Sequence, residues 1–205
     1  MGLLLNGHGT EAPSEWVCRW THLISDTRPG GPKALDLACG HGRHTRWLAR
    51  QGCHVTSLDR DPTALASLTP LAPQVRTLVA DIENAPWPLP AQAFDAVVVT
   101  NYLWRPLWPH ILDSLAPGGV LIYETFAHGN ATVGKPSRPD FLLQPGELLK
   151  VCSGLRVVAF EDGFLREPER YVQRIVAMAP PLNHTPSQES STQPAPPRYL
   201  LRATG

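Results

Sequence analysis

Short apolar runs alternate with helix-like segments along most of the chain, and this alternation constrains the fold more than any other feature. Five runs have the length and apolar content of a buried strand: residues 34–38, 54–58, 75–79, 94–99 and 120–123. Helical spacing is found at 43–51, 62–68 and 107–115. Strands that alternate with helices pair in parallel and are covered on both faces. We therefore predict an α/β protein with three layers, α-β-α.

The two ends of this region differ from its middle. Apolar residues recur at helical spacing within residues 1–32, where we expect one cap helix: Trp16, Val17, Trp20, Leu23 and Ile24. Strand-like runs at 155–160 and 171–179 leave no room for a crossover helix, so they are expected to pair antiparallel. Residues 181–205 are rich in Pro, Ser, Thr and Gln, which favours a disordered tail. One main domain, 33–180, remains.

Composition excludes few classes of function but weighs against some. The 18 basic and 18 acidic residues cancel, so no overall field attracts nucleic acid. No apolar run is long enough to span a bilayer, and residues 3–5 are too short a run for a signal peptide. The four cysteines show no CxxC spacing. We expect them to be reduced and mostly buried in a cytoplasmic protein.

The residues between the first strand and the first helix form the most informative local pattern. Gly40 and Gly42 permit a close approach of backbone to ligand, and the following helix start offers N–H groups to an anion. The third glycine of a dinucleotide-binding turn is missing. Asp36, four positions before Gly40, would repel a pyrophosphate and attract a cationic group. The pattern predicts a ligand with positive charge and without phosphate.

Two further acids follow the next two strands. Asp59 is placed to accept hydrogen bonds from ribose hydroxyls, and Asp81, with Ile82 beside it, is placed to meet an adenine. Each acid also has a structural interpretation, because Asp59 or Asp61 could cap a helix and Asp81 could start a turn. Three acids at the ends of successive strands, together with the glycine turn, predict a nucleoside cofactor site.

In combination, the motifs resemble those of the class I S-adenosylmethionine-dependent methyltransferases. The resemblance covers about residues 17–179, and its motifs lie at residues 36–44, 54–61, 79–82, 94–99 and 115–121. It implies a Rossmann-like, seven-stranded, mostly parallel sheet whose last strand is antiparallel. Ala38 stands where the family usually has a first glycine. Residues 42–44 are most similar to the small, single-domain, tellurite-resistance type.

The resemblance implies S-adenosyl-L-methionine as cofactor and methyl transfer to a small-molecule acceptor as activity. Residues 100–106 lack the Asn-Pro-Pro-aromatic signature of amino-group methylation on bases or glutamine, so those substrates are disfavoured. The predicted cofactor site comprises Asp36, Ala38, Cys39, Gly40, Gly42, Arg43, Asp59, Arg60, Asp81, Ile82, Thr100 and Asn101.

Residues after the fourth and fifth strands are the candidates for acceptor contact. Glu124 is the candidate general base, and Tyr102 is the candidate to orient the acceptor. Further candidates are Asn101, Arg105, Tyr123 and His128. Alternatively, Tyr123 is sheet core, Arg105 a surface cation and His128 a loop residue without a role. The long segment 126–143, with Lys135 and Arg138, is either a lid or a solvated loop.

Several alternatives and absences complete the prediction. His41 and His44 are a close pair without a third ligand, so no metal is expected. An RNA or protein methyltransferase would need a basic surface, for which Arg166, Arg170 and Arg174 are candidates. A non-catalytic protein that binds S-adenosylmethionine for regulation is the other alternative, and a nicotinamide oxidoreductase is a distant fourth. We expect no membrane contact, and a monomer or homodimer.

Overall fold

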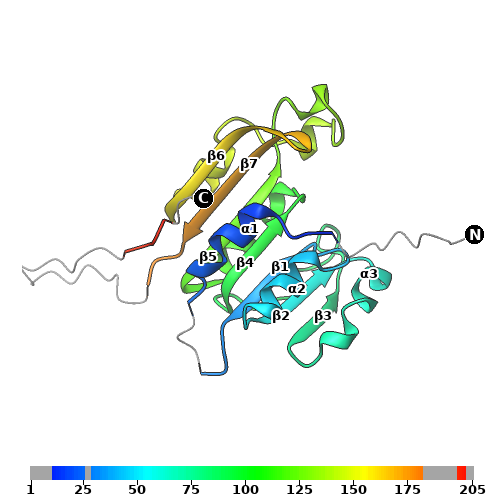
Figure 1. The fold of residues 1–205 in the computed structure, drawn as a ribbon, viewed down its shortest axis with the longest axis vertical. Coiled ribbons are helices and arrows are strands. Elements are labelled where there is room, and N and C mark those ends of the chain that lie inside the picture. Colours follow the sequence, from blue (N-terminus) through cyan, green and yellow to red (C-terminus); the bar gives the residue numbers. More distant parts are fainter. Residues whose placement is uncertain (1–10, 26–28, 182–197, 202–205) are drawn as a thin grey trace, which may run out of the picture.

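A computed structural model describes residues 11–25, 29–181 and 198–201. Its centre is one seven-stranded sheet in the order β3-β2-β1-β4-β5-β7-β6 (Figure 1). The strands are β1 Lys33–Leu37, β2 His54–Asp59, β3 Val75–Val79, β4 Phe94–Thr100, β5 Leu115–Phe126, β6 Arg156–Arg166 and β7 Glu169–Met178. The first five pair in parallel, and β7 lies antiparallel between β5 and β6. The predicted sheet and its antiparallel end are confirmed.

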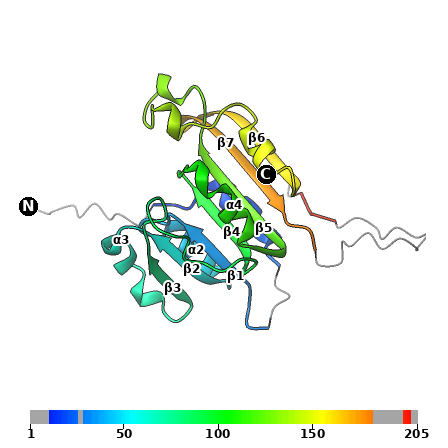
Figure 2. The same cartoon turned by 180° about the vertical axis from the view of Figure 1, so that it is seen from behind.

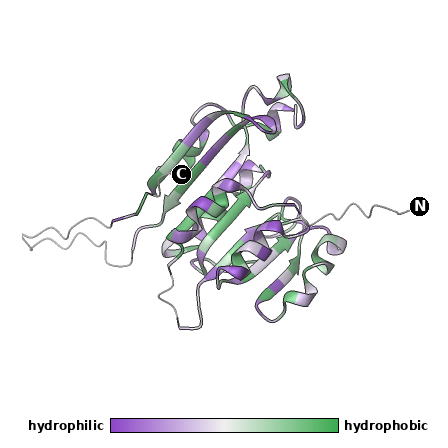
Figure 3. Ribbon diagram, viewed as in Figure 1, coloured by the Kyte–Doolittle hydropathy of each residue, from purple (hydrophilic) through white to green (hydrophobic). Residues whose placement is uncertain are grey.

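Helices cover both faces of the sheet. They are α1 Glu15–Trp20, α2 Arg43–Arg50, α3 Pro62–Ala66, α4 Trp108–Asp113 and α5 Glu147–Val151. Side chains of β4 alternate between two apolar clusters: Ala96 and Val98 pack with α1, α2 and α3, whereas Val97 and Val99 pack with α4 and α5. Figures 1 and 2 show the two helical layers from opposite sides, and Figure 3 shows the hydrophobic β4 between them. The three-layer prediction is therefore confirmed.

The start of β5 differs from the sequence prediction. The sequence predicts a strand at 120–123, but β5 already begins at Leu115 and includes residues 117–119, and its pairing with β4 shifts register between Phe94 and Ala96. Gly118 has a left-handed φ of 74°. A Cβ on Gly119 would lie 2.9 Å from the carbonyl oxygen of Phe94. The glycines therefore bend the strand without ending it.

Residues 11–25 and 198–201, the described segments nearest the two ends, pack on the sheet face that carries α1. The side chain of Ser14 caps α1 by accepting the N–H of Trp16. At the other end, the Arg156 guanidinium lies 5.3 Å from the ring centre of Tyr199, and His22 Nε2 lies 2.9 Å from the Leu200 carbonyl oxygen. Residues 198–201 of the predicted disordered tail thus contact the domain. The rest of that tail from 182 onwards, and residues 1–10, lie outside the described residues.

Candidate active site

The glycine turn lies at the carboxyl end of β1, where the chain leaves the sheet and enters α2. Ala38, Gly40 and Gly42 all have left-handed φ angles, of 52°, 52° and 76°. Gly42 also packs closely, because a Cβ there would lie 2.5 Å from Cδ2 of Leu68. The turn is therefore shaped by backbone conformations that glycine adopts readily and that Ala38 adopts under strain.

A cavity of about 240 Å³ opens beside the turn at the ends of β1, β2 and β3. Its lining consists of Ala38, Leu58, Asp59, Arg60, Ala80, Asp81, Ile82, Glu83 and Tyr102. Six of these nine residues are predicted site residues. This nucleoside-side cavity gathers the acids from the ends of β2 and β3, as expected for the carboxyl edge of a parallel sheet.

The two predicted acids in this cavity, Asp59 and Asp81, also accept hydrogen bonds from backbone N–H groups, those of Gly40 and Glu83 respectively. Asp59 Oδ2 accepts the N–H of Gly40 at 2.7 Å, while Asp61 caps α3 by accepting the N–H of Thr63 at 2.8 Å. Asp81 Oδ2 accepts from Asn84 Nδ2 at 2.9 Å, and this hydrogen bond lowers the pKa of Asp81. The alternative of a turn-forming Asp81 is therefore realised, yet the same residue lines the cavity.

A second cavity, of about 230 Å³, lies on the other side of Ala38. Its lining consists of Glu11, Ala38, Cys39, Gly40, His41, Gly42, Arg43, His44, Thr100 and Asn101. Seven of these ten are predicted cofactor residues. Arg43 Nη1 and Glu11 Oε2 lie 3.8 Å apart, so this turn-side cavity presents one cation and one anion. Burial raises the pKa of the Cys39 thiol, so Cys39 is not a thiolate at neutral pH.

Asp36 does not occupy the place predicted for it. Its side chain is buried and lines neither cavity. Thr45 Oγ1 donates to Asp36 Oδ2 at 2.7 Å and lies 2.8 Å from Ser57 Oγ. Burial raises the pKa of Asp36 to about 6. The sequence predicts that Asp36 holds the cationic end of a ligand, directly or through water. The carboxylate faces hydroxyls behind the turn, which does not place it for direct contact, and a contact through water stays a prediction.

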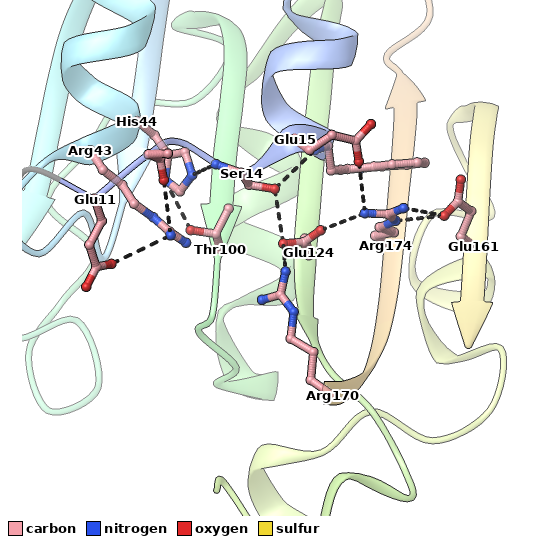
Figure 4. A network of polar contacts seen from close by, with 12 residues as sticks. Glu11, Ser14, Glu15, Arg43, His44, Thr100, Glu124, Glu161, Arg170 and Arg174 are labelled. Atoms are coloured by element: carbon pink, nitrogen blue, oxygen red, sulfur yellow. Dashed lines mark hydrogen bonds and ion pairs between the residues drawn. The ribbon is translucent and has the colours of Figure 1, made fainter. Parts of the chain in front are cut away.

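His44 joins the turn to the segment before α1. Its ring accepts the N–H of Ser14 at Nε2, at 3.0 Å, and Nδ1 lies 3.2 Å from Thr100 Oγ1 (Figure 4). Burial, followed by the charge of Arg43, lowers the pKa of His44 to about 3. The ring is therefore neutral and carries its proton on Nδ1, from which it donates to Thr100.

Glu124 lies in an ion-pair network and lines neither of the two cavities formed by the described residues at the turn. Its fully buried carboxylate accepts from Ser14 Oγ at 3.1 Å, and from Arg170 Nη2 and Arg174 Nη1, each at 3.3 Å (Figure 4). Arg174 continues the row to Glu161 at 2.6 Å. The carboxylate is occupied by three donors inside the protein. The geometry thus contradicts the general-base prediction for Glu124.

The same network changes the interpretation of the predicted basic surface. Arg170 and Arg174 are both paired with Glu124, and their side chains are only 19% and 9% exposed. Arg166 remains exposed near the end of β6. Two of the three cations that an RNA-binding surface would use are therefore already neutralised inside the protein.

Tyr102 and Asn101 are the candidate acceptor residues that line these cavities, Tyr102 the nucleoside-side one and Asn101 the turn-side one. The Tyr102 hydroxyl donates to Glu83 Oε1 at 3.2 Å, and burial, followed by the charge of Glu83, raises its pKa. Tyr123, by contrast, packs in the core and donates to the carbonyl oxygen of Tyr102 at 2.6 Å. Tyr123 is thus sheet core, as its alternative interpretation had it, and it supports the backbone of Tyr102.

Arg105 fixes the long segment after β5. It donates to both carboxylate oxygens of Glu147, at 2.6 and 2.9 Å, and to the carbonyl oxygens of Asp140 and Leu142. Arg105 therefore fastens residues 140–147 to the segment after β4, and its donors are not free to bind an acceptor. Further along the same segment, His128, Lys135 and Arg138 are exposed, which fits the solvated-loop alternative.

Three residues at the site were not singled out from the sequence. Glu11 and Glu83 each line one cavity, and Ser14 joins His44 to Glu124. Ser14 had a local signal, since a serine immediately before an apolar helix is typical of an N-cap. Glu11 had none, because its charged neighbour is 32 positions away in the sequence.

The described residues form neither a metal site nor a membrane-spanning helix. Across residues 11–25, 29–181 and 198–201, no three His, Cys, Asp or Glu side chains gather in a way that could hold a metal ion. None of the helices in this part of the chain combines the length and apolar character needed to cross a membrane.

Comparisons with known proteins agree with this geometry. The profile of a family described as Methyltransferase domain matches residues 34–119. Demethylmenaquinone methyltransferase of Tropheryma whipplei is 29% identical over 103 residues, which are 48% of this chain and 43% of that protein. Malonyl-[acyl-carrier protein] O-methyltransferase of Serratia marcescens is 33% identical over 106 residues, 49% of this chain and 40% of that protein. The chain thus spans less than half the length of these relatives.

Solved structures extend the likeness over most of the fold. TehB from Haemophilus influenzae superposes with a TM-score of 0.66 and 22% identity, covering 84% of this chain and 64% of that one. The fold is that of the class I S-adenosylmethionine-dependent methyltransferases, and residues 34–119 match the profile of their methyltransferase domain. The fold that the resemblance implied is confirmed.

The cofactor of this domain and fold is S-adenosyl-L-methionine, and the site residues suit it. The nucleoside-side cavity offers carboxylates to hydroxyl and amine donors, and the turn-side cavity offers opposite charges to an amino acid. The two meet at Ala38, as one ligand with a nucleoside end and an amino-acid end requires.

Proposed function

We propose that the protein transfers the methyl group of S-adenosylmethionine to a small-molecule acceptor. The observation that carries the proposal is the pair of cavities that meet at Ala38, one with Asp59 and Asp81 and the other with Arg43 and Glu11. The relatives support methyl transfer because both are named as methyltransferases, one acting on demethylmenaquinone and the other on malonyl-[acyl-carrier protein].

The site residues have distinct roles in this proposal. Asp59 accepts hydrogen bonds from ribose hydroxyls, Asp81 and the backbone of Ile82 meet the adenine, and Arg43 with the turn N–H groups meets the carboxylate. The bound cofactor supplies an electrophilic methyl group for in-line attack by the acceptor. The protein contributes chiefly by alignment, which can lower such a barrier by about 7–11 kcal/mol.

Tyr102 has a positioning role in this proposal. Its hydroxyl donates its proton to Glu83, so Tyr102 offers an acceptor molecule an oxygen lone pair and the face of its ring at the edge of the nucleoside-side cavity. Asn101, next to it, closes the turn-side cavity.

Two measurements test the proposal. Titration calorimetry should detect binding of S-adenosylhomocysteine, and incubation with methyl-labelled cofactor and fractionated extract should label a small metabolite. Absence of cofactor binding would refute the proposal. Label in RNA, with binding that weakens steeply as salt rises, would favour the RNA methyltransferase alternative.

A further inference from the structure

Glu11 and Arg43 face each other at the wall of the turn-side cavity. Their nearest charged atoms are 3.8 Å apart, and the side chains are 75% and 23% exposed. An exposed pair at this distance contributes little to stability. Both charges therefore remain available to a ligand that carries the matching opposite charges.

The position of Glu11 is set by the folded protein. The segment 11–14 is held where Arg43 Nη1 donates to the Ala12 carbonyl oxygen at 3.5 Å, and where Ser14 donates to His44 and to Glu124 (Figure 4). Ser14 and His44 are both buried. Glu11 is thus presented to the cavity three residues before the buried anchor Ser14.

Glu11 is also the acid best placed for a cation in this cavity. Among the described residues of its lining, Glu11 alone carries a carboxylate. Asp36, the acid expected from the sequence, lies behind the turn on Thr45. An α-amino acid group carries an ammonium and a carboxylate close together, which matches a carboxylate and a guanidinium on one cavity wall.

We infer that Glu11 binds the ammonium group of the cofactor while Arg43 binds its carboxylate, so that the segment before α1 completes the site. The pair then selects nucleoside ligands that end in an α-amino acid over nucleosides that lack one. This inference rests on the proposed function, because it assumes that the cofactor occupies the two cavities.

The test compares three nucleosides by titration calorimetry with the intact protein. S-adenosylhomocysteine carries both charged groups, its decarboxylated analogue keeps only the ammonium, and 5′-methylthioadenosine has neither. Glu11→Gln should weaken the first two ligands about tenfold, as expected for loss of one charged hydrogen bond, and leave the third unchanged. Arg43→Gln should weaken only S-adenosylhomocysteine.

Glu83→Gln is the matched control, because Glu83 is an exposed carboxylate on the nucleoside-side cavity. Any effect of this control should be equal for the three ligands. If the unmutated protein fails to bind S-adenosylhomocysteine, the proposed function fails and this inference fails with it. If it binds, but Glu11→Gln leaves that affinity unchanged or weakens 5′-methylthioadenosine equally, the inference alone is overturned.

Discussion

The backbone N–H of Gly40 donates a hydrogen bond of 2.7 Å to Oδ2 of Asp59, so the acid at the end of β2 also fixes the turn after β1. Asp59 Oδ1 accepts the N–H of Asp61 at 3.0 Å. A carboxylate has about four acceptor positions, so two remain for a ligand in the nucleoside-side cavity. One side chain thereby couples the shape of the turn to the contact with the sugar.

Asp59→Asn should lower the affinity for S-adenosylhomocysteine by about tenfold or more, because it removes charged hydrogen bonds from both the turn and the ligand. Titration calorimetry measures the affinity, and circular dichroism checks that the fold is kept. Asp61→Asn is the control, since Asn caps a helix as well as Asp does and Asp61 lines neither cavity. Unchanged affinity in Asp59→Asn would remove the ribose assignment.

Ala38→Gly should stabilise the protein by about 0.5–1 kcal/mol, because Ala38 has a φ of 52° that strains a residue with a Cβ. Urea unfolding gives the free energy. Ala66→Gly, at an exposed position in α3, should instead destabilise by up to about 1 kcal/mol. A loss of stability in Ala38→Gly would show that the methyl group contributes packing that outweighs the strain.

The sequence predicted those parts of the site whose signals are local. Asp59 and Asp81 each follow an apolar strand directly, and the carboxyl ends of parallel strands share one edge of the sheet. β4 was predicted for the same kind of reason, since an unbroken apolar run of that length is typical of a strand buried on both faces. For these residues, the position relative to an apolar run in the sequence was sufficient to predict where they lie in the fold.

The sequence could not predict contacts that depend on distant partners. Glu124 has the right place at the end of a strand, but its environment is set by Arg170 and Arg174, which lie 46 and 50 positions away. Asp36 is on a strand end too, yet its orientation depends on the hydroxyl of Thr45 in the next helix. In both cases the face on which a side chain lies, and its partner there, decide between a ligand contact and a structural role.

Arg105→Lys should destabilise the protein by about 1–2 kcal/mol, because lysine keeps the charge but loses the planar group that holds Glu147 and two carbonyl oxygens. Urea unfolding measures the loss, and amide exchange should speed up at residues 139–147. Arg138→Lys, at an exposed pair with Asp140, should change neither quantity. Equal amide exchange at residues 139–147 in both variants would show that the Arg105 hydrogen bonds do not hold this segment in place.

Glu124→Gln should destabilise the protein by about 3 kcal/mol, because the buried Arg174 and the half-buried Arg170 would lose their shared carboxylate. Glu161→Gln, at the exposed end of the same row, should cost about 1 kcal/mol or less. Both values follow from urea unfolding. If Glu124→Gln kept full stability and lost methyl transfer, the general-base role predicted from the sequence would be restored.

His44 should make the fold sensitive to mild acid. Its pKa falls from 6.5 to about 3 on folding. Between these two pH values, His44 is protonated in the unfolded chain and neutral in the folded protein. The stability contributed by neutral His44 is present above pH 6.5 and is lost as the pH falls from there towards 3. Between pH 7 and 5 this loss amounts to about 2 kcal/mol.

His44→Gln offers a ring-free acceptor to Ser14 and has no proton to take up, so it should abolish that part of the pH dependence. Urea unfolding of both proteins at pH 7 and pH 5 measures the difference, and the opposite contribution of Asp36, whose raised pKa favours folding as the pH falls from 6 to 4, cancels in the comparison. An equal change in unfolding free energy between pH 7 and pH 5 for the two proteins would mean that His44 is protonated in the folded state at pH 5. Nε2 could then not accept the N–H of Ser14.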